Sequence, residues 1–214
     1  MLAQNVQNLN LHCLLIPMPN VVVIAGPNGA GKSTTAPGLL RQVFALEKFV
    51  NADTIASGLS AFDPESVAFG AGRLMLMRLR ELAASRADFA FETTLASRTF
   101  APWLRRLQQD GYLAHLIYLW LPSADLAVER VAERVRRGGH VVPEVVVRRR
   151  YGRSLDNFFN SYRPLADSWL MLDNSQQVAP RAIAWRDTGG PIRIVRGGPY
   201  EELRKGYEKD VLSN

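Results

Sequence analysis

Short, almost wholly apolar runs alternate along this chain with longer stretches in which apolar residues recur every three or four positions. The run at residues 21–25 ends at a glycine and is typical of a strand that is buried on both faces of a parallel sheet. Runs of this kind predict strands at residues 21–25, 48–53, 88–93, 112–121 and 169–174.

The stretches between these runs carry helix signals. Apolar residues at helical spacing predict helices at about residues 32–43, 63–86, 99–109 and 122–137, and Pro143 can begin another. Residues 182–195 predict a small terminal β-hairpin, followed by a helix near residues 201–207. Strands that alternate with helices imply right-handed crossovers. The predicted fold class is therefore α/β, with a mainly parallel five-stranded sheet covered on both faces.

The composition is that of a globular domain. The chain has 214 residues, of which 47% are hydrophobic, and this suits one domain with a substantial core. We expect that domain to cover residues 20–214, and residues 1–19 to be a disordered or loosely packed leader. Cys13 is the only cysteine, so an intramolecular disulfide and a cysteine-based metal site are excluded.

Targeting signals and net charge indicate where the protein is located and what kind of partner it binds. No apolar run reaches the roughly 18–20 residues that a membrane span needs, and the first residues lack the basic region of a signal peptide. We therefore expect a cytoplasmic protein with no membrane partner. The formal net charge is +6 and the pI is about 9.8, a balance that favours anionic partners such as nucleotides or sugar phosphates.

The first predicted strand runs directly into GPNGAGKST, which fits the pattern G-x-x-x-x-G-K-[ST] from Gly26 to Ser33. Glycines let the backbone turn tightly so that its N–H groups point at phosphate oxygens, and the following helix adds its positive end. We expect Lys32 to reach the β- and γ-phosphates of a nucleotide and Ser33 to ligate Mg²⁺. The predicted nucleotide-binding residues are Gly26, Pro27, Asn28, Gly29, Ala30, Gly31, Lys32, Ser33 and Thr34.

A phosphate loop identifies a nucleotide but not a reaction. GTPases carry N-K-x-D, which this chain lacks, and the D-x-x-G-like run at Asp187 lies too late in the chain. The LSGGQ-like signature and the Asp-Glu strand end of a transport ATPase are also missing from the sequence. Kinases of small metabolites remain the leading class, and the predicted architecture is a three-layer phosphate-loop kinase fold.

A kinase must bind an acceptor hydroxyl and take its proton, and open α/β sheets bind ligands at the carboxyl ends of their strands. Asp53 ends one predicted strand and is the candidate base, although it could also cap the helix that is expected to begin at Thr54-Ile55. Glu92 ends the next strand and could hold Mg²⁺ through water, bind a sugar hydroxyl, or act as a cap or ion-pair partner. Thr93 and Thr94 could bind the acceptor. Arg73 is more typical of a solvated residue but would suit an acceptor diphosphate.

Taken together, the ordered motifs GPNGAGKST, FVNAD, FETTL, RVRRGGHVVP with RRRYGRSL, and LDNS resemble the zeta toxin family of phosphate-loop kinases, in a short, single-domain form. The resemblance covers most of residues 21–175. It implies a lid like that of adenylate-kinase-type enzymes, ATP and Mg²⁺ as the donor pair, and an antitoxin protein as a possible partner. The activity typical of the family is phosphorylation of the 3′-hydroxyl of UDP-N-acetylglucosamine, so the acceptor implied is a nucleotide sugar.

The resemblance also implies roles for single residues. Lys32 and Ser33 hold the donor, Asp53 accepts the proton, and Glu92 lies in the acceptor pocket. Arginines after the fourth strand clamp the transferred phosphoryl group.

Residues 129–154 gather eight arginines around the turn Gly138-Gly139-His140. The pattern predicts a lid over about residues 130–153, made of two helices hinged at the two glycines. Because phosphoryl transfer depends on positioning and electrostatics, a lid arginine can contribute about three to five powers of ten in rate. The arginines predicted to contact phosphate are Arg134, Arg149 and Arg150, a choice that rests more on the resemblance than on helix geometry. His140 could either contact a phosphate or cap the turn.

Two other functions stay open. The same machinery could phosphorylate another metabolite or a nucleic-acid 5′-hydroxyl, or the basic segment could belong to a non-enzymatic nucleic-acid-binding module. The aromatic residues near the arginines, such as Tyr151 and Phe158, fall on an apolar helical stripe that is more typical of a core. Nucleic acid is therefore the less favoured partner.

Overall fold

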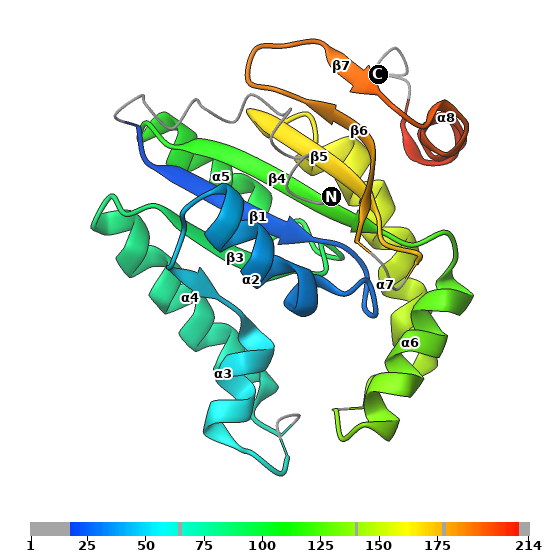
Figure 1. The fold of residues 1–214 in the computed structure, drawn as a ribbon. Coiled ribbons are helices and arrows are strands. Elements are labelled where there is room, and N and C mark those ends of the chain that lie inside the picture. Colours follow the sequence, from blue (N-terminus) through cyan, green and yellow to red (C-terminus); the bar gives the residue numbers. More distant parts are fainter. Residues whose placement is uncertain (1–17, 64–65, 140, 177–178, 210–214) are drawn as a thin grey trace.

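One mixed sheet forms the centre of the computed structural model, which describes residues 18–63, 66–139, 141–176 and 179–209 (Figure 1). Its strand order is β2-β3-β1-β4-β5-β6-β7. The first five strands in this order are parallel, whereas β6 and β7 are antiparallel. The strands are β1 (Asn20–Ala25), β2 (Phe49–Val50), β3 (Phe89–Thr93), β4 (Leu113–Trp120), β5 (Ser168–Asp173), β6 (Arg181–Arg186) and β7 (Ile192–Ile194).

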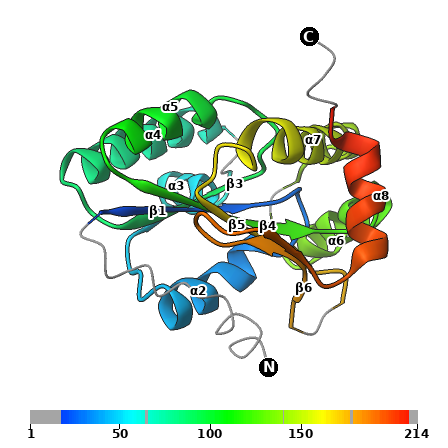
Figure 2. The ribbon, with the colours of Figure 1, turned by 90° about the horizontal axis from the view of Figure 1, so that it is seen from above.

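Helices cover both faces of this sheet. Figure 2 shows α4, α5 and α7 on one side of the strands and α2 on the other, which confirms the predicted three-layer arrangement. The helices are α2 (Lys32–Val43), α3 (Ala52–Leu59), α4 (Ala68–Ala84), α5 (Phe100–Gln109), α6 (Ala124–Arg136), α7 (Glu144–Asn157) and α8 (Gly197–Tyr207), and a short π-helix, η2 (Phe158–Tyr162), follows α7.

The core lies where the sheet meets these helices. All residues of β1 and β4 are buried, as expected for strands covered on both faces. The inner face of α7 and η2 contributes Tyr151, Leu155, Phe159 and Tyr162, the stripe that helical periodicity predicts. Tyr151 and Phe158 are therefore core residues in this structure rather than exposed stacking surfaces.

Three elements differ from the prediction. The helix expected from residue 63 begins only at Ala68. The strand expected at residues 48–53 is limited to Phe49–Val50, because the helix that follows it, α3, already begins at Ala52 rather than at Thr54. It can start there because the side chain of Asn51 caps it. The terminal hairpin is not a separate unit either: β6 pairs with β5, so the hairpin extends the main sheet.

Strand register brings the expected site residues together. β1 lies between β3 and β4, so that Ile24 is paired with Glu92 and Ala25 with Thr93. The loop that follows Ala25 therefore emerges beside Glu92. Figure 1 shows the α3–α4 pair and the α6–α7 pair projecting on either side of this edge of the sheet. Within the described ranges, every helix is too short or too polar to span a lipid bilayer.

Candidate active site

The phosphate loop needs glycine at its turns. Gly29 and Gly31 both have a φ of 77°, in the left-handed region that glycine adopts readily. A Cβ atom at Gly29 would lie 2.7 Å from the carbonyl oxygen of Ala127, and one at Gly31 would lie 2.6 Å from the side-chain amide of Asn174. Because α2 begins at the next residue, its unpaired N–H groups and positive end face the same loop.

Lys32 is held inside this loop. Its ammonium group donates to the carbonyl oxygen of Pro27 at 3.0 Å and lies 3.8 Å from Oε1 of Glu92. Burial lowers the pKa of Lys32, and the carboxylates of Glu92 and Asp53 oppose that shift. A bound polyphosphate would oppose it further, so the site favours an anion next to this ammonium.

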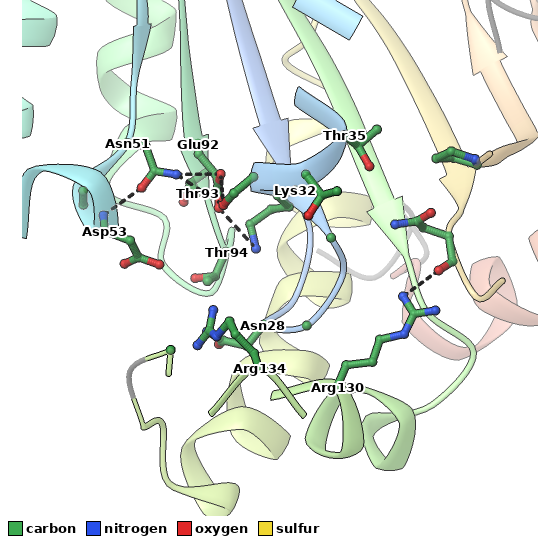
Figure 3. Close-up of a pocket in the computed structure, with 18 of the residues that line it drawn as sticks. Asn28, Lys32, Thr35, Asn51, Asp53, Glu92, Thr93, Thr94, Arg130 and Arg134 are labelled. Carbon is green, nitrogen blue, oxygen red and sulfur yellow. Dashed lines mark hydrogen bonds and ion pairs between the residues drawn. The ribbon is translucent and has the colours of Figure 1, made fainter. Parts of the chain in front are cut away.

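Glu92 connects the phosphate loop to the neighbouring strands. Its Oε2 atom accepts hydrogen bonds from the Ser33 hydroxyl at 2.9 Å and from the side-chain amide of Asn51 at 2.7 Å. Figure 3 shows Asn51, Glu92 and Lys32 joined in one line of contacts. The end of β3 therefore carries a carboxylate whose oxygens already face the residues that would bind a nucleotide.

Asp53 lies beside this group on the first turn of α3. The side-chain oxygen of Asn51 accepts from the backbone N–H groups of Asp53 at 2.7 Å and Thr54 at 3.3 Å. The helix cap is thus Asn51, and the alternative interpretation of Asp53 as the cap is wrong. Asp53 is exposed to the cleft, and Figure 3 shows its carboxylate, the Lys32 ammonium and the Arg134 guanidinium pointing into one space.

All these groups line one cleft of about 1170 Å³. On the sheet side it is bounded by the phosphate loop, by Asn51 and Asp53, and by the end of β3 with Thr93 and Thr94. Met75 of α4 and Phe100 of α5 add an apolar patch. The opposite wall is formed by α6, the turn that follows it and α7, through Arg130, Glu133, Arg134, Arg137, Gly138, Gly139 and Arg150.

The base of the lid is joined to the phosphate loop. The Arg130 guanidinium donates to the carbonyl oxygens of Asn174 at 2.7 Å and Ser175 at 2.8 Å. The Asn174 side chain donates in turn to the carbonyl oxygen of Ala30 at 2.7 Å. Arg130 therefore connects α6 to the end of β5, and this contact holds one wall of the nucleotide cleft in place.

The predicted lid residues divide into two groups. Arg134 and Arg150 line the cleft, and both lie close enough to Lys32 to lower its pKa. Arg150 also lies 3.5 Å from the side-chain oxygen of Asn28. Arg149 is exposed and lies outside the cleft lining. The same holds for Arg73 of α4, which was considered for an acceptor diphosphate. His140 lies outside the described residues, as do residues 1–17 of the expected leader.

Two further arginines are paired with carboxylates. Arg137 lines the cleft and contacts Glu133 at 2.9 Å. Arg148 pairs with Glu144 at 2.7 Å and Asp125 at 2.6 Å on the exposed side of the lid. The contact with Glu133 uses the Nε–H of Arg137, which is one of its five N–H donors.

The donor atoms fit a magnesium ion that arrives with a nucleotide. Nowhere in the described residues do three or more His, Cys, Asp or Glu side chains gather into a metal-binding group. Mg²⁺ does not need such a group, because it is usually held by one or two carboxylates, substrate phosphates and water. The Ser33 hydroxyl and the Glu92 carboxylate, 2.9 Å apart, form an incomplete set of that kind.

Sequence reasoning missed several residues of this site, among them Asn51, Arg130, Glu133 and Asn174. A signal existed for the two asparagines, since both stand at the end of a predicted strand where a polar residue faces the ligand edge. Arg130 and Glu133 had no such signal, because their roles depend on how α6 docks against the end of β5.

Comparisons with known proteins agree with this geometry. The model of the family described as AAA domain matches residues 21–157. An uncharacterized protein of Haemophilus influenzae is 26% identical over 140 residues, which cover 64% of this chain and 96% of that protein.

Solved structures resemble most of the fold. A chain of the crystal structure of AvrRxo1-ORF1:-ORF2 with ATP matches with a TM-score of 0.67 at 15% identity, over 94% of this chain and 66% of that chain. A chain from the PezAT chromosomal toxin–antitoxin system of Streptococcus pneumoniae matches with a TM-score of 0.59 at 16% identity, over 80% and 74%. The chain thus spans about two thirds of the AvrRxo1 chain, and at these identities the likeness shows the fold.

Proposed function

Because this chain belongs to the AAA domain family and has a phosphate-loop kinase-like fold, we propose that it is an ATP-dependent kinase of a small-molecule hydroxyl. One observation carries the proposal: Lys32, Ser33, Glu92 and Asp53 all line the same cleft. Arginines line the opposite wall of that cleft. Nucleotide binding alone would not require a carboxylate such as Asp53 at the open end of that cleft.

The donor half of the reaction is assigned to the phosphate loop. The turn at Gly29 and Gly31 and the first N–H groups of α2 bind the phosphates of ATP, and Lys32 neutralises charge on the β- and γ-phosphates. Ser33 and Glu92 would hold Mg²⁺, which when bound supplies positive charge to the phosphate oxygens.

The acceptor half is assigned to Asp53. Its carboxylate takes the proton of the acceptor hydroxyl as the acceptor oxygen bonds to the γ-phosphorus, and the bond between that phosphorus and the β,γ-bridging oxygen breaks to release ADP. Arg134 and Arg150 stabilise the negative charge that is spread over the phosphoryl oxygens during transfer.

For the acceptor we propose a nucleotide sugar such as UDP-N-acetylglucosamine. The proposal is supported by the resemblance of the motifs to zeta toxins and by the mixed lining beside Asp53. Thr93 and Thr94 offer hydroxyl groups there, and Met75 and Phe100 offer apolar surface. Because one structural neighbour comes from a toxin–antitoxin system, we also propose an antitoxin protein as a partner of this chain.

The test is to incubate the protein with Mg²⁺-ATP and a panel of nucleotide sugars, and to search by mass spectrometry for the gain of one phosphate. Lys32→Ala and Asp53→Asn proteins serve as controls and should form product far more slowly than the wild type. A parallel reaction with a 5′-hydroxyl oligonucleotide tests the alternative acceptor. Product from the oligonucleotide alone would refute the nucleotide-sugar proposal, and no ATP binding at all would refute a kinase.

A further inference from the structure

We propose that Asn51 is a positioning residue that sets the helix bearing Asp53 and the carboxylate of Glu92 in one fixed arrangement. This inference rests on the proposed kinase function. Asn51 connects the two halves of the site because it contacts both: the first turn of α3, where Asp53 lies, and the end of β3, where Glu92 faces the phosphate loop.

The geometry leaves one orientation for the Asn51 amide. The backbone N–H groups of Asp53 and Thr54 are donors, so they must meet its oxygen, at 2.7 Å and 3.3 Å. The Glu92 carboxylate is an acceptor, so it must meet the NH₂ group, at 2.7 Å. The Ser33 hydroxyl lies 3.4 Å from the same nitrogen. Only 7% of Asn51 is exposed, so competition from water is small.

Helix capping by itself does not account for this residue. Ser123 caps α6 through its hydroxyl, which accepts from the N–H of Leu126 at 3.1 Å. A serine at position 51 would serve α3 in the same way, because serine and asparagine are caps of similar strength. Its shorter side chain would not reach Glu92. The longer amide is therefore explained by the second contact, to the carboxylate.

The contact between Asn51 and Glu92 affects the binding of both Mg²⁺-ATP and the acceptor. Hydrogen bonds from outside a metal site orient its ligands, and their loss typically lowers metal affinity or activity about 10–100-fold. Without the Asn51 amide, Glu92 keeps Ser33 and Lys32 as neighbours but loses its short contact toward α3. The carboxylate and the base-bearing helix could then move independently.

The experiment compares Asn51→Ser with Asn160→Ser, using ATP binding by calorimetry at increasing Mg²⁺. Asn160 is a matched control outside the cleft: its amide accepts from the N–H of Lys209 at 2.9 Å and donates to the carbonyl oxygen of Tyr207 at 2.7 Å. In Asn51→Ser, the Mg²⁺ concentration that gives half of the enhancement of ATP binding should rise about tenfold. ATP affinity without Mg²⁺ should stay close to that of the wild type. Asn160→Ser should match the wild type in both respects.

A second variant, Asn51→Asp, keeps the shape and the helix cap but turns an oxygen toward Glu92. The added negative charge would repel Glu92 and the nucleotide, so ATP affinity without Mg²⁺ should fall about tenfold. The enhancement by Mg²⁺ should grow, which is the opposite of the change in Asn51→Ser. This variant decides the matter if Asn51→Ser does not fold.

The outcomes distinguish a failure of the role proposed for Asn51 from a failure of the proposed kinase function. A folded Asn51→Ser protein with unchanged Mg²⁺ dependence overturns the positioning role, as does an Asn51→Asp protein with unchanged affinities. If the wild-type protein binds no ATP with or without Mg²⁺, the proposed function fails instead. Opposite shifts in the two variants, with none in Asn160→Ser, support the role of Asn51.

Discussion

Two polar networks lie at opposite ends of the same strands. At the carboxyl end, Lys32, Ser33 and Asn51 surround Glu92. At the amino end, the His115 ring lies 2.7 Å from the Ser168 hydroxyl and 2.9 Å from the side-chain oxygen of Asn20, and the Asn20 amide donates to Asp88 at 3.1 Å. Both networks are largely buried, and both link neighbouring strands of the sheet.

By residue type alone, the amino-end network looks the more reactive of the two. A serine beside a histidine that a third polar group orients is the pattern of an activated nucleophile. However, the cavity beside His115 measures about 10 Å³, which is barely room for one water molecule. The carboxyl-end network opens onto about 1170 Å³. Residues of types common in catalysis, even when hydrogen bonds join them, therefore mark an active site only where a substrate can enter.

The largest test of this comparison is Arg134→Ala, which removes a cation from the wall opposite the carboxyl-end network. We expect turnover to fall about a thousandfold or more, because an arginine at this place stabilises charge in the transition state. The apparent affinity for ATP should change much less. Steady-state kinetics separate the two effects.

Arg153→Ala is the control for this loss, because Arg153 is an exposed arginine of α7 outside the cleft lining. Its turnover should match the wild type. A loss of ATP affinity at unchanged turnover in Arg134→Ala would contradict the transition-state role.

Asp53→Asn should lower turnover about 100- to 10,000-fold, the range typical for loss of a general base. The melting temperature should stay almost unchanged, because Asn51 and not Asp53 caps α3. Kinetics and thermal unfolding on the same preparation test both statements. An active Asp53→Asn enzyme would remove Asp53 from the mechanism.

His115→Leu should affect the fold and leave the cleft intact. It leaves the buried Ser168 hydroxyl and the Asn20 side chain without their ring partner, which costs about 1–3 kcal/mol per unsatisfied group. Urea denaturation measures that loss. ATP affinity should equal that of the wild type, and a selective loss of ATP binding in a stable His115→Leu protein would show that the two ends of the sheet are coupled.

The smallest expected effect is the dependence of stability on pH. Burial lowers the pKa of His115 below the usual 6.5, and the negative charges of Asp167 and Asp88 oppose the shift in part. Near pH 6 the unfolded chain therefore binds more protons at this residue than the folded protein does. The free energy of unfolding should fall as pH drops below 6.5, with a slope of at most about 1.4 kcal/mol per pH unit for this one group.

Urea denaturation between pH 7.5 and 5.5 measures this slope in the wild type and in His115→Leu. The variant should lose the part of the slope that His115 contributes. An identical slope in the two proteins would assign the pH dependence to other groups.

Much of the fold was predictable because its signals are local. The helix predicted at residues 32–43 was confirmed as α2, and five apolar runs became the five parallel strands. The start of the helix α3 was misplaced from Ala52 to Thr54, because it depends on the capping side chain of Asn51. The place of the terminal hairpin was also missed, since pairing of β6 with β5 is a long-range contact.

The order of residues along the chain was sufficient to identify a nucleotide loop, because the motif from Gly26 to Ser33, placed between a strand and a helix, predicts one local geometry. It also brought Asp53 and Glu92 to one edge of the sheet, since the carboxyl ends of parallel strands share that edge. Glu92 does lie at the end of a strand, whereas Asp53 lies on α3 and not on β2. Those inferences need only spacing and the direction of the strands.

The tertiary structure decided which side chains meet. Register between β1 and β3 sets Glu92 beside the phosphate loop, and the docking of α6 and α7 turns Arg134 and Arg150 into the cleft while Arg149 stays exposed. Consecutive residues on a helix point about 100° apart. Neighbouring arginines therefore have different surroundings although the residue type is the same. The packing of distant segments decides which of these arginines face the cleft, and no local pattern in the sequence encodes that packing.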